Sequence, residues 1–420
     1  MSELALFGGS PVRTKPFPHW PVFDEAEEKA VLDVVRSGQW WRYSMGEAID
    51  VPVPAGVRSK VGEFQDLFAK AQGARYGIAC ASGTAAIEVV LKAMGIGFGD
   101  EVIVPPYTFI ATATAPMLIG ARPVFCDIHP ATLNLDPSRL EKAITPRTKA
   151  VMPVHFAGLA ADMGSILDIC GRHGIPVVED ACHGHGGTWN GRGLGTIGVA
   201  GTFSFQASKN MTAGEGGLIT TDDRALAELC ESYIWVGRKA RRPWYEHHYL
   251  GWNYRMTEFQ GAILVEQLRR LGDQTDRRQA NAFYLNERLM AIPGIHPLDV
   301  PAYATRHSCH IYCFRFDEAE FGISRADFLQ ALSAEGIPAT GGYAHPLYRN
   351  PMFQDPSLGS DYSRFIALCP NSERACKEMV WLEHRLLLGD RTDMDDVVEA
   401  FWKISAHRHE FEPSQCEAGS

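Results

Sequence analysis

The feature that most constrains the fold is an alternation of short apolar runs with helical patterns between residues 64 and 265. The apolar runs are β-rich, are bounded by Gly, Pro or Asp, and read RYGIACASG, EVIVPP, RPVFCD, AVMPVH, GIPVVED, GTFSF and GGLITT. Between several of them, segments such as TAAIEVVLKAM and MGSILDICGRH carry apolar residues at helical spacing. Near-continuous apolar strands that alternate with helices are typical of a mainly parallel sheet covered on both faces. The sequence therefore predicts a large α/β domain.

The rest of the 420-residue chain indicates a second, smaller unit. Residues 255–291 are expected to form long helices, and residues 305–407 combine a strand-like IYCFRF with the helical SRADFLQALSAEG. We expect a large domain at 1–265, which includes an N-terminal segment, and linking helices with a small α/β domain at 266–407. The polar residues 408–420 are expected to form a disordered tail.

Composition argues against several classes of function. Fifty acidic and 40 basic side chains give a formal net charge of −10, and the longest basic run is RKARR, so nucleic acid is not an expected partner. No apolar run is long enough to span a membrane and the N-terminus lacks the apolar core of a signal peptide, so we expect a cytoplasmic protein. The ten cysteines are scattered without CxxC pairs and are expected to be reduced thiols. Neither a GxSxG elbow nor a GxxxxGK[ST] loop is present, which counts against a serine hydrolase and a P-loop enzyme.

Residues that could bind an anion or stack on a ring follow two of the predicted strands. Ligands of a parallel α/β sheet bind beyond the carboxyl ends of its strands. Ser82, Gly83 and Thr84 follow RYGIACA and open a helix, where free N–H groups and the helix dipole favour a phosphate; a plain Ser or Thr N-cap is the alternative. Tyr107 and Phe109 follow EVIVPP and offer aromatic surface at the same edge, although core packing would also explain them.

Asp180 ends the strand-like GIPVVED and is followed by Cys182, His183 and His185. Three interpretations are open: a metal site, an acid/base pair, or an acid that holds a ring nitrogen. A metal site needs further ligands of suitable geometry, which the sequence does not nominate, and HSCHIYC at 307–313 has the alternation of a strand. We therefore expect no metal.

Lys209 follows GTFSF and precedes the glycine-rich turn GEGG. Lysine is rarely buried, because an unpaired ammonium is costly to desolvate, but a desolvated lysine has a neutral amine that can form a Schiff base. Pyridoxal phosphate needs such a lysine, a carboxylate for its pyridinium nitrogen, a phosphate cradle and a surface that stacks on its ring. The chain supplies all four after successive strands, with Ser204 added to the cradle. We therefore expect this cofactor to be bound at Lys209.

A competing motif lies at Gly193–Gly198, where GLGTIG matches the dinucleotide-binding pattern GxGxxG. That pattern has its meaning directly after a strand, whereas here it follows the polar TWNGR. We interpret it as a loop.

The stretch EDACHGHGGTWNGRGLGTIGVAGTFSFQASKNMTAGEGGLITT resembles the core of the DegT/DnrJ/EryC1/StrS family of sugar aminotransferases. Further family-like stretches are SGTAAIEVVLKAMGIGFGDEVIVPPYTF, TPRTKAVMPVHFAGLAADM and GWNYRMTEFQGAI, so that the resemblance covers about residues 17–405. It implies fold type I of the pyridoxal-phosphate-dependent transferases, the aspartate aminotransferase-like fold, with a large mainly parallel-sheet domain and a smaller C-terminal α/β domain. It also implies amino transfer in which the cofactor alternates with pyridoxamine phosphate.

The resemblance implies roles for single residues. Lys209 would hold the cofactor and move the proton, Asp180 would pair with the pyridinium nitrogen, and His183 would lie near the phenolic oxygen. Phe109 would stack on the ring, with Tyr107 as the alternative. The phosphate would be held by Ser82, Gly83, Thr84 and Ser204.

Other residues are assigned to a neighbouring subunit or to the substrate. Asn253, in GWNYR, would reach the phosphate of a second copy, which implies a homodimer with a shared active site. His345, in GGYAHPLY, corresponds to a substrate-side position. Cationic and tryptophan side chains near the mouth could bind the donor carboxylate or a polyol, or could be ordinary surface and packing residues: Arg42, Trp40, Trp41 and Arg238.

Two branches of the family are similar to this chain. QWWR and FSFQASKNMTAGEGG resemble the scyllo-inosose and 2-deoxy-scyllo-inosose aminotransferases, which use L-glutamine, and also the 3-amino-5-hydroxybenzoate synthases. The first branch is favoured by FRFDEAEFGISRADF and NSERA, whereas WLEHRLLL is close to both branches. Residues 43–58 look like an insertion near the cleft. We expect transfer of an amino group from an amino acid, L-glutamine, to a ketone on a cyclitol or sugar in antibiotic-type biosynthesis. The alternatives are an aromatising dehydratase, a nucleotide keto-sugar aminotransferase, and a cofactor-binding protein without turnover, against which the intact Lys209, Asp180 and His183 argue.

Overall fold

A computed structural model of the protein describes residues 3–41, 59–240, 242–243, 245–355 and 362–411. Three features expected from the sequence lie wholly or largely outside these ranges: Arg42, the insertion at 43–58, and most of the C-terminal tail. No helix within the described ranges is long and apolar enough to cross a membrane.

The larger unit is built on two groups of strands that adjoin along one edge. One group has the order β1 (Tyr76–Cys80), β9 (Gly217–Thr221), β8 (Ala200–Ser204), β5 (Val178–Asp180), and the other has the order β3 (Arg122–Phe125), β2 (Glu101–Val104), β4 (Thr148–Val151). Parallel bridges between Val151 and Val177 and between Val154 and Asp180 join the two groups. Only β9 pairs antiparallel with its neighbours. The mainly parallel sheet predicted from the seven apolar runs is confirmed.

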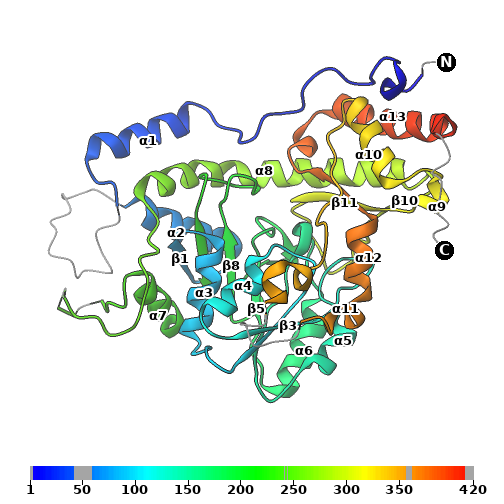
Figure 1. Ribbon diagram of the computed structural model, residues 1–420. Coiled ribbons are helices and arrows are strands. Elements are labelled where there is room, and N and C mark those ends of the chain that lie inside the picture. The colour runs from blue at the N-terminus through cyan, green and yellow to red at the C-terminus, as the bar shows by residue number, and fades with distance from the viewer. Residues whose placement is uncertain (1–2, 42–58, 241, 244, 356–361, 412–420) are drawn as a thin grey trace.

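Helices between these strands cover the sheet, as the alternating pattern predicts (Figure 1). The covering helices are α2 (Lys60–Gln72), α3 (Gly83–Ala93), α4 (Ala111–Leu118), α5 (Pro137–Ala143), α6 (Met163–His173) and α7 (Arg224–Ile234). Their starts follow capping chemistry: the side chain of Ser82 accepts a hydrogen bond from Ala85 N at α3, and that of Asp162 accepts one from Ser165 N at α6. The strands of both groups are almost wholly buried, which explains their apolar sequences.

The smaller unit has a three-stranded antiparallel sheet in the order β10 (Ile295–Pro297), β11 (Ile311–Phe316), β12 (Met379–Glu383). Its helices are α9 (Glu318–Phe321), α10 (Arg325–Ala334), α12 (Pro370–Glu378) and α13 (Arg391–His407). The short helix α11 (Phe365–Leu368) instead packs on the larger unit, where Phe365 contacts Phe125 of β3. Phe314, Phe328 and Phe401 are buried against one another in its core, with ring centroids 5.3–6.4 Å apart.

The connection between the units differs from the expected division at residues 265 and 266. A single helix, α8 (Glu258–Leu289), contains that division and runs from the larger unit to the smaller one (Figure 1). The N-terminal segment, expected with the larger domain, places Leu4 and Phe17 in the core of the smaller unit. Helix α1 (Glu25–Ser37) then packs on α8. The first 40 residues therefore span both units.

Candidate functional site

The residues nominated at the ends of β1, β5 and β8 line one cavity. It has a volume of about 420 Å³. Its lining includes Ser82, Gly83, Thr84, Phe109, Thr112, Asp180, Cys182, His183, Ser204 and Lys209. Parallel strands bring these residues together because their carboxyl ends meet at one edge of the sheet.

The first turn of α3 forms one wall of this cavity. The backbone of Ser82 is extended and its side chain caps the helix, so the free N–H groups of the first turn belong to Gly83 and Thr84. A Cβ on Gly83 would lie 2.8 Å from Ser204 Cβ and 3.0 Å from Cys182 Sγ, closer than real side chains approach. Only glycine fits here, and the wall suits a phosphate group that approaches the backbone.

Asp180 is buried at the end of β5 and keeps part of its acceptor capacity for the cavity. One carboxylate oxygen accepts a hydrogen bond from Thr112 Oγ1 at 2.7 Å, and the other accepts one from Cys182 N at 3.1 Å. An ionised carboxylate offers about four acceptor positions, so two remain for a ligand. This geometry suits a protonated ring nitrogen.

His183 and Lys209 both line the same cavity. Burial lowers the pKa of His183 well below its ordinary value, so its ring is neutral, and its Nδ1 is buried without a partner in the described part of the chain. Burial also lowers the pKa of Lys209, against the opposing effect of Cys182 and Asp180. A lysine with a lowered pKa supplies a neutral amine more readily, which is what a carbonyl-binding and proton-transferring group requires.

The cavity as a whole fits pyridoxal phosphate. It combines a helix N-terminus that suits the phosphate, Asp180 for the ring nitrogen, Lys209 for the aldehyde and the half-exposed ring of Phe109 for stacking. The unpartnered Nδ1 of His183 gives the cofactor's polar substituent a neighbour in the cavity.

A second cavity of about 550 Å³ lies next to the first and is shared between the two units. Phe109, His183, Gln206, Ser208 and Lys209 line both cavities. The second cavity is completed by Trp20, Ala207, His310, Ile311, Thr340, Tyr343, Trp381, Leu382, Glu383, His384 and Arg385. Lys209 therefore lines both a site that fits the cofactor and a second space, with a mixed polar and apolar lining, that is large enough for a small substrate.

His310 is a site residue that the sequence reasoning missed. The amide of Asn210 donates to Ser308 O at 2.7 Å, so its oxygen accepts from His310 Nδ1 at 3.0 Å and leaves Nε2 as the unprotonated nitrogen. The His310 ring lies 4.2 Å from that of His183, and burial lowers its pKa well below the ordinary value. The alternation of HSCHIYC predicts only a strand, and β11 begins just after His310, at Ile311. The signal in the sequence is Asn210, a polar residue directly after Lys209 that needs a partner.

Several nominated residues lie outside both cavities. Tyr107 is fully buried among Phe156, Tyr343 and Trp381, so that Phe109 alone of the two aromatics borders the site. His345 is exposed and contacts Asn350, with Nε2 and Oδ1 3.2 Å apart.

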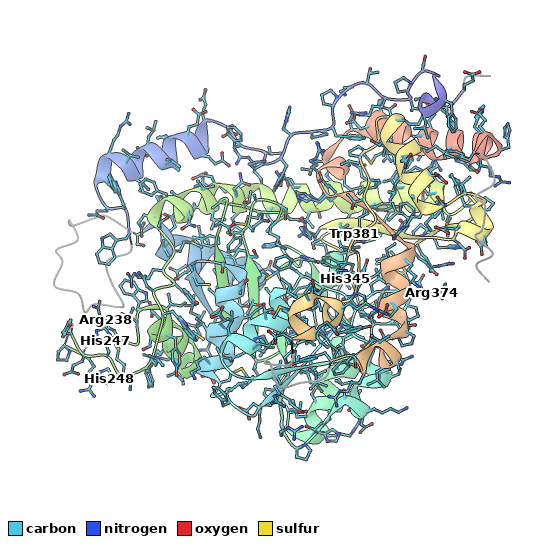
Figure 2. The ribbon with its side chains drawn as sticks, viewed as in Figure 1. Arg238, His247, His248, His345, Arg374 and Trp381 are labelled. Atoms are coloured by element: carbon cyan, nitrogen blue, oxygen red, sulfur yellow. The ribbon has the colours of Figure 1, made fainter. Side chains whose placement is uncertain are left out.

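The residues assigned to the mouth and to a second subunit lie in a different region. Trp41 packs beside Trp235, which also forms a bridge with the exposed Asn253. Arg238 belongs to the same end of the molecule, far from His345 and Trp381 (Figure 2). Within one chain, this end does not contribute to the two cavities.

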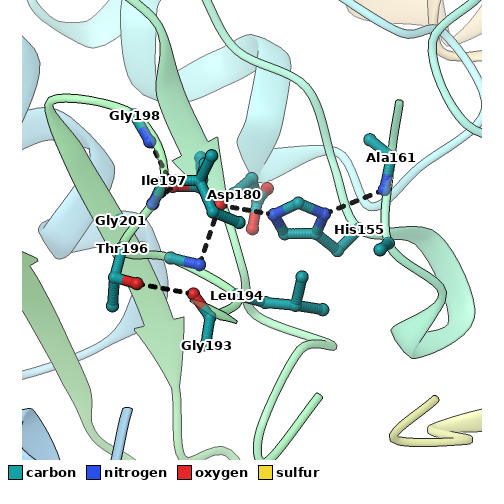
Figure 3. A network of polar contacts seen from close by, with 12 residues as sticks. His155, Ala161, Asp180, Gly193, Leu194, Thr196, Ile197, Gly198 and Gly201 are labelled. Atoms are coloured by element: carbon teal, nitrogen blue, oxygen red, sulfur yellow. Dashed lines mark hydrogen bonds and ion pairs between the residues drawn. The ribbon is translucent and has the colours of Figure 1, made fainter. Parts of the chain in front are cut away.

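Gly193 ends the two-residue strand β7 (Arg192–Gly193), and the rest of the glycine motif, residues 194–198, is a loop, as expected. The N–H groups of this loop bind a protein carboxylate (Figure 3). The fully buried Glu179 accepts from Gly195 N at 2.8 Å, Ile197 N at 2.6 Å and Gly198 N at 2.7 Å. His155 Nδ1 accepts from Ala161 N, so its Nε2–H donates to Glu179 at 2.8 Å. The loop thus holds the strand that carries Asp180.

The lysine between these cavities, with a carboxylate and a phosphate-binding helix start on the cofactor side, defines a pyridoxal-phosphate-dependent aminotransferase of fold type I. Sequence comparison agrees: the model of the DegT/DnrJ/EryC1/StrS aminotransferase family matches residues 54–402. The chain belongs to this family.

Relatives and solved structures cover nearly the whole chain. A protein of Streptoalloteichus tenebrarius named "Putative L-glutamine:3-amino-2,3-dideoxy-scyllo-inosose aminotransferase" is 39% identical over 417 residues, 96% of this chain and 98% of the relative. The 3-amino-5-hydroxybenzoate synthase of Amycolatopsis mediterranei is 36% identical over 389 residues, 91% of this chain and 96% of the relative. A crystal structure of 3-amino-5-hydroxybenzoic acid synthase superposes with a TM-score of 0.85 at 34% identity, covering 94% of this chain and 100% of that one.

Proposed function

We propose that this aminotransferase moves an amino group from L-glutamine to a ketone on a cyclitol ring. The observation that carries the proposal is the position of Lys209, which lines both the cavity that fits the cofactor and the second cavity, where polar and apolar side chains are mixed. The names of the similar inosose aminotransferases supply the donor and the acceptor class. The expected pathway is aminocyclitol biosynthesis of the antibiotic type.

The protein's own residues would bind and orient the cofactor and the substrate, and one of them would move a proton. The start of α3 with Ser204 holds the phosphate, and Asp180 keeps the ring nitrogen protonated. The cofactor, when bound, supplies an electron sink for the charge that develops at the substrate carbon. Lys209 Nζ would take the proton from the amino-bearing carbon of the donor in the first half-reaction and deliver a proton to the former ketone carbon of the acceptor in the second, always from one face, which makes the transfer stereospecific.

The second cavity suits a polyol better than an apolar ketone. Gln206, Thr340 and Tyr343 offer donors and acceptors along its lining, and His310 offers an acceptor nitrogen. Trp20 and Trp381 supply flat apolar faces, against which the C–H side of a six-membered ring can pack. A cyclitol presents both kinds of surface.

A homodimer with a shared site is part of this proposal. Asn253 is exposed and lies apart from the cavities of its own chain, as expected of a residue that serves a second copy. Trp41 and Arg238 share that end of the molecule and could complete the mouth of the partner's site.

An aromatising synthase is the second candidate. The likeness to 3-amino-5-hydroxybenzoate synthase, in sequence and in structure, favours it, and that function would also need Lys209. The two candidates differ in product, because amino transfer to a saturated ring leaves no aromatic absorbance.

The test is to incubate the cofactor-loaded protein with L-glutamine and a keto-cyclitol such as scyllo-inosose, and to identify products by mass spectrometry. The proposal predicts an aminocyclitol and a keto acid in equal amounts. Formation of 3-amino-5-hydroxybenzoate from a non-aromatic ring acid that already carries the amine, with no amination of keto-cyclitols, would support the synthase instead.

A further inference from the structure

The second cavity contains a single guanidinium among its described lining residues, that of Arg385. Together with the cofactor cavity, the other charged side chains of the lining are Lys209, Asp180, Glu215 and Glu383, apart from the histidines. An α-amino acid brings a carboxylate into this space, whereas a keto-cyclitol brings none. The same cavity therefore has to accept a charged and an uncharged substrate in turn.

Arg385 is tied to the loop that carries Lys209. His384 Nε2 donates to Ser208 O at 3.0 Å, and Trp20 Nε1 donates to Ala207 O at 2.9 Å. Ser208 precedes Lys209 directly, and Arg385 follows His384 directly. The first bond holds the end of β12 against the lysine loop, and the second holds the N-terminal segment against the same loop. Arg385 lines the second cavity beside them.

The present partner of Arg385 is easy to exchange. Its Nε donates to Glu383 at 2.6 Å, and its Nη1 lies 3.4 Å from Pro18 O. The two side chains of this ion pair are 30% and 62% exposed, and exposed pairs contribute little to stability. A substrate carboxylate can therefore replace Glu383, and the planar guanidinium binds carboxylates through two parallel hydrogen bonds.

A second positive charge lies behind the same wall. Arg278 is 0% exposed, has no carboxylate partner among the described residues, and lies over the ring of Trp20 at 5.2 Å. Burial lowers the pKa of His384 well below its ordinary value, and the positive charges of Arg278 and Arg385 lower it further. This end of the cavity is therefore positive and favours an anionic group.

We propose that Arg385 binds the α-carboxylate of the amino-acid donor and returns to Glu383 when the uncharged acceptor occupies the cavity. The inference rests on the proposed function, which supplies the two substrates, and it names the residue that separates them. Arg385 would thus set the affinity for the donor without affecting that for the acceptor.

The test separates the two half-reactions in Arg385→Met and Arg385→Lys. Loss of a charge-assisted pair predicts a half-saturating L-glutamine concentration that rises about 10- to 100-fold in Arg385→Met and less in Arg385→Lys. The half-reaction with the keto-cyclitol should stay within about twofold of the wild type. L-Glutaminol, which lacks the carboxylate, should be an equally poor donor for wild type and variant.

Equilibrium binding gives a second readout that needs no turnover. In calorimetry, 4-carbamoylbutanoate, which is glutamine without its amino group, should bind the wild type and lose affinity by a similar factor in Arg385→Met. Binding of scyllo-inositol should not change. Arg374→Met is the matched control, because Arg374 is an exposed arginine paired with Glu378 on α12, outside both cavities (Figure 2).

An unchanged response to L-glutamine in Arg385→Met would overturn the inference, and so would an equal loss in both half-reactions. Binding of 4-carbamoylbutanoate that depends on Arg385, in a wild type that transfers no amino group, would support the inference and overturn the proposed function alone.

Discussion

Glu179 and Asp180 are neighbours on β5 that serve opposite purposes. Successive residues of a strand point to opposite faces, so these two carboxylates look into different parts of the molecule. Glu179 is fully buried and receives hydrogen bonds from three loop N–H groups and His155. Asp180 receives two hydrogen bonds and borders an open cavity.

The comparison separates the polar groups that hold the fold from those that do chemistry. On the Glu179 side, each carboxylate oxygen receives two hydrogen bonds from the protein, so no acceptor position of Glu179 is left for a ligand. On the Asp180 side, the carboxylate has spare capacity, His183 has an unpartnered nitrogen, and Lys209 is poorly hydrated. Removing a group should therefore affect stability on one side and activity on the other.

The largest expected effect is that of Lys209→Ala on the site side. Amino transfer should fall by at least about a thousandfold, since both the cofactor bond and the proton carrier are lost. The free energy of unfolding should stay the same or rise, because a poorly hydrated amine is removed. Single-turnover kinetics with L-glutamine and urea unfolding of the cofactor-free protein measure the two effects. A fall in stability would contradict the view that residues on the Asp180 side serve activity and not stability.

Glu179→Gln tests the other side of the strand. The amide keeps the shape but removes the charge and points its NH₂ at a donor, so unfolding should become easier by about 3 kcal/mol. The fraction that remains folded should keep near-normal turnover. Asp180→Asn is the matched change on the next residue and should show the reverse, with nearly normal urea unfolding and strongly reduced turnover.

Gly83→Ala tests whether the start of α3 binds the phosphate of the cofactor. A methyl group there would meet Ser204 Cβ at 2.8 Å, so the start of α3 must shift away from the sheet. We expect the dissociation constant of pyridoxal phosphate to rise by about tenfold, or about 1.4 kcal/mol. Fluorescence titration of the cofactor-free protein measures it, and an unchanged constant would show that the phosphate lies elsewhere.

The smallest effect concerns pH and a histidine of the core behind the site. Burial among Phe68, Phe203 and Phe205 lowers the pKa of His185 to about 3, whereas the unfolded chain titrates near the ordinary value of 6.5. As the pH falls below 6.5 the unfolded state takes up the proton first, so stability is full above 6.5 and declines below it. His185 should contribute a slope of up to about 1.4 kcal/mol per pH unit. His185→Phe should flatten the curve by that amount between pH 6 and pH 5 in urea titrations, and an unchanged slope would contradict the assignment.

The sheet and the cofactor side of the site were predictable from the sequence. Buried parallel strands are apolar throughout and bounded by turn residues, so their positions are visible, and their topology brings Ser82, Asp180 and Lys209 to one edge. The antiparallel direction of β9 could not be predicted from the sequence, because an antiparallel strand buried on both faces is as apolar as a parallel one.

The substrate side was much less predictable. His310, Arg385 and Trp20 reach the second cavity from positions 101, 176 and 189 residues away from Lys209 in the sequence. Their approach depends on how β11, β12 and the N-terminal segment pack on the lysine loop, and no local pattern encodes that packing. Tyr107 shows the converse: it follows a strand end as Phe109 does, yet its ring packs into the core.

The central claim is that Lys209 is the residue that bonds to the cofactor. The direct measurement is borohydride reduction of the protein loaded with pyridoxal phosphate, followed by proteolysis and mass spectrometry of the lysine-containing peptides. We expect a phosphopyridoxyl group on Lys209, and none on that residue after prior incubation with L-glutamine. A label on another lysine, or the absence of any label in a protein that binds the cofactor, would contradict it.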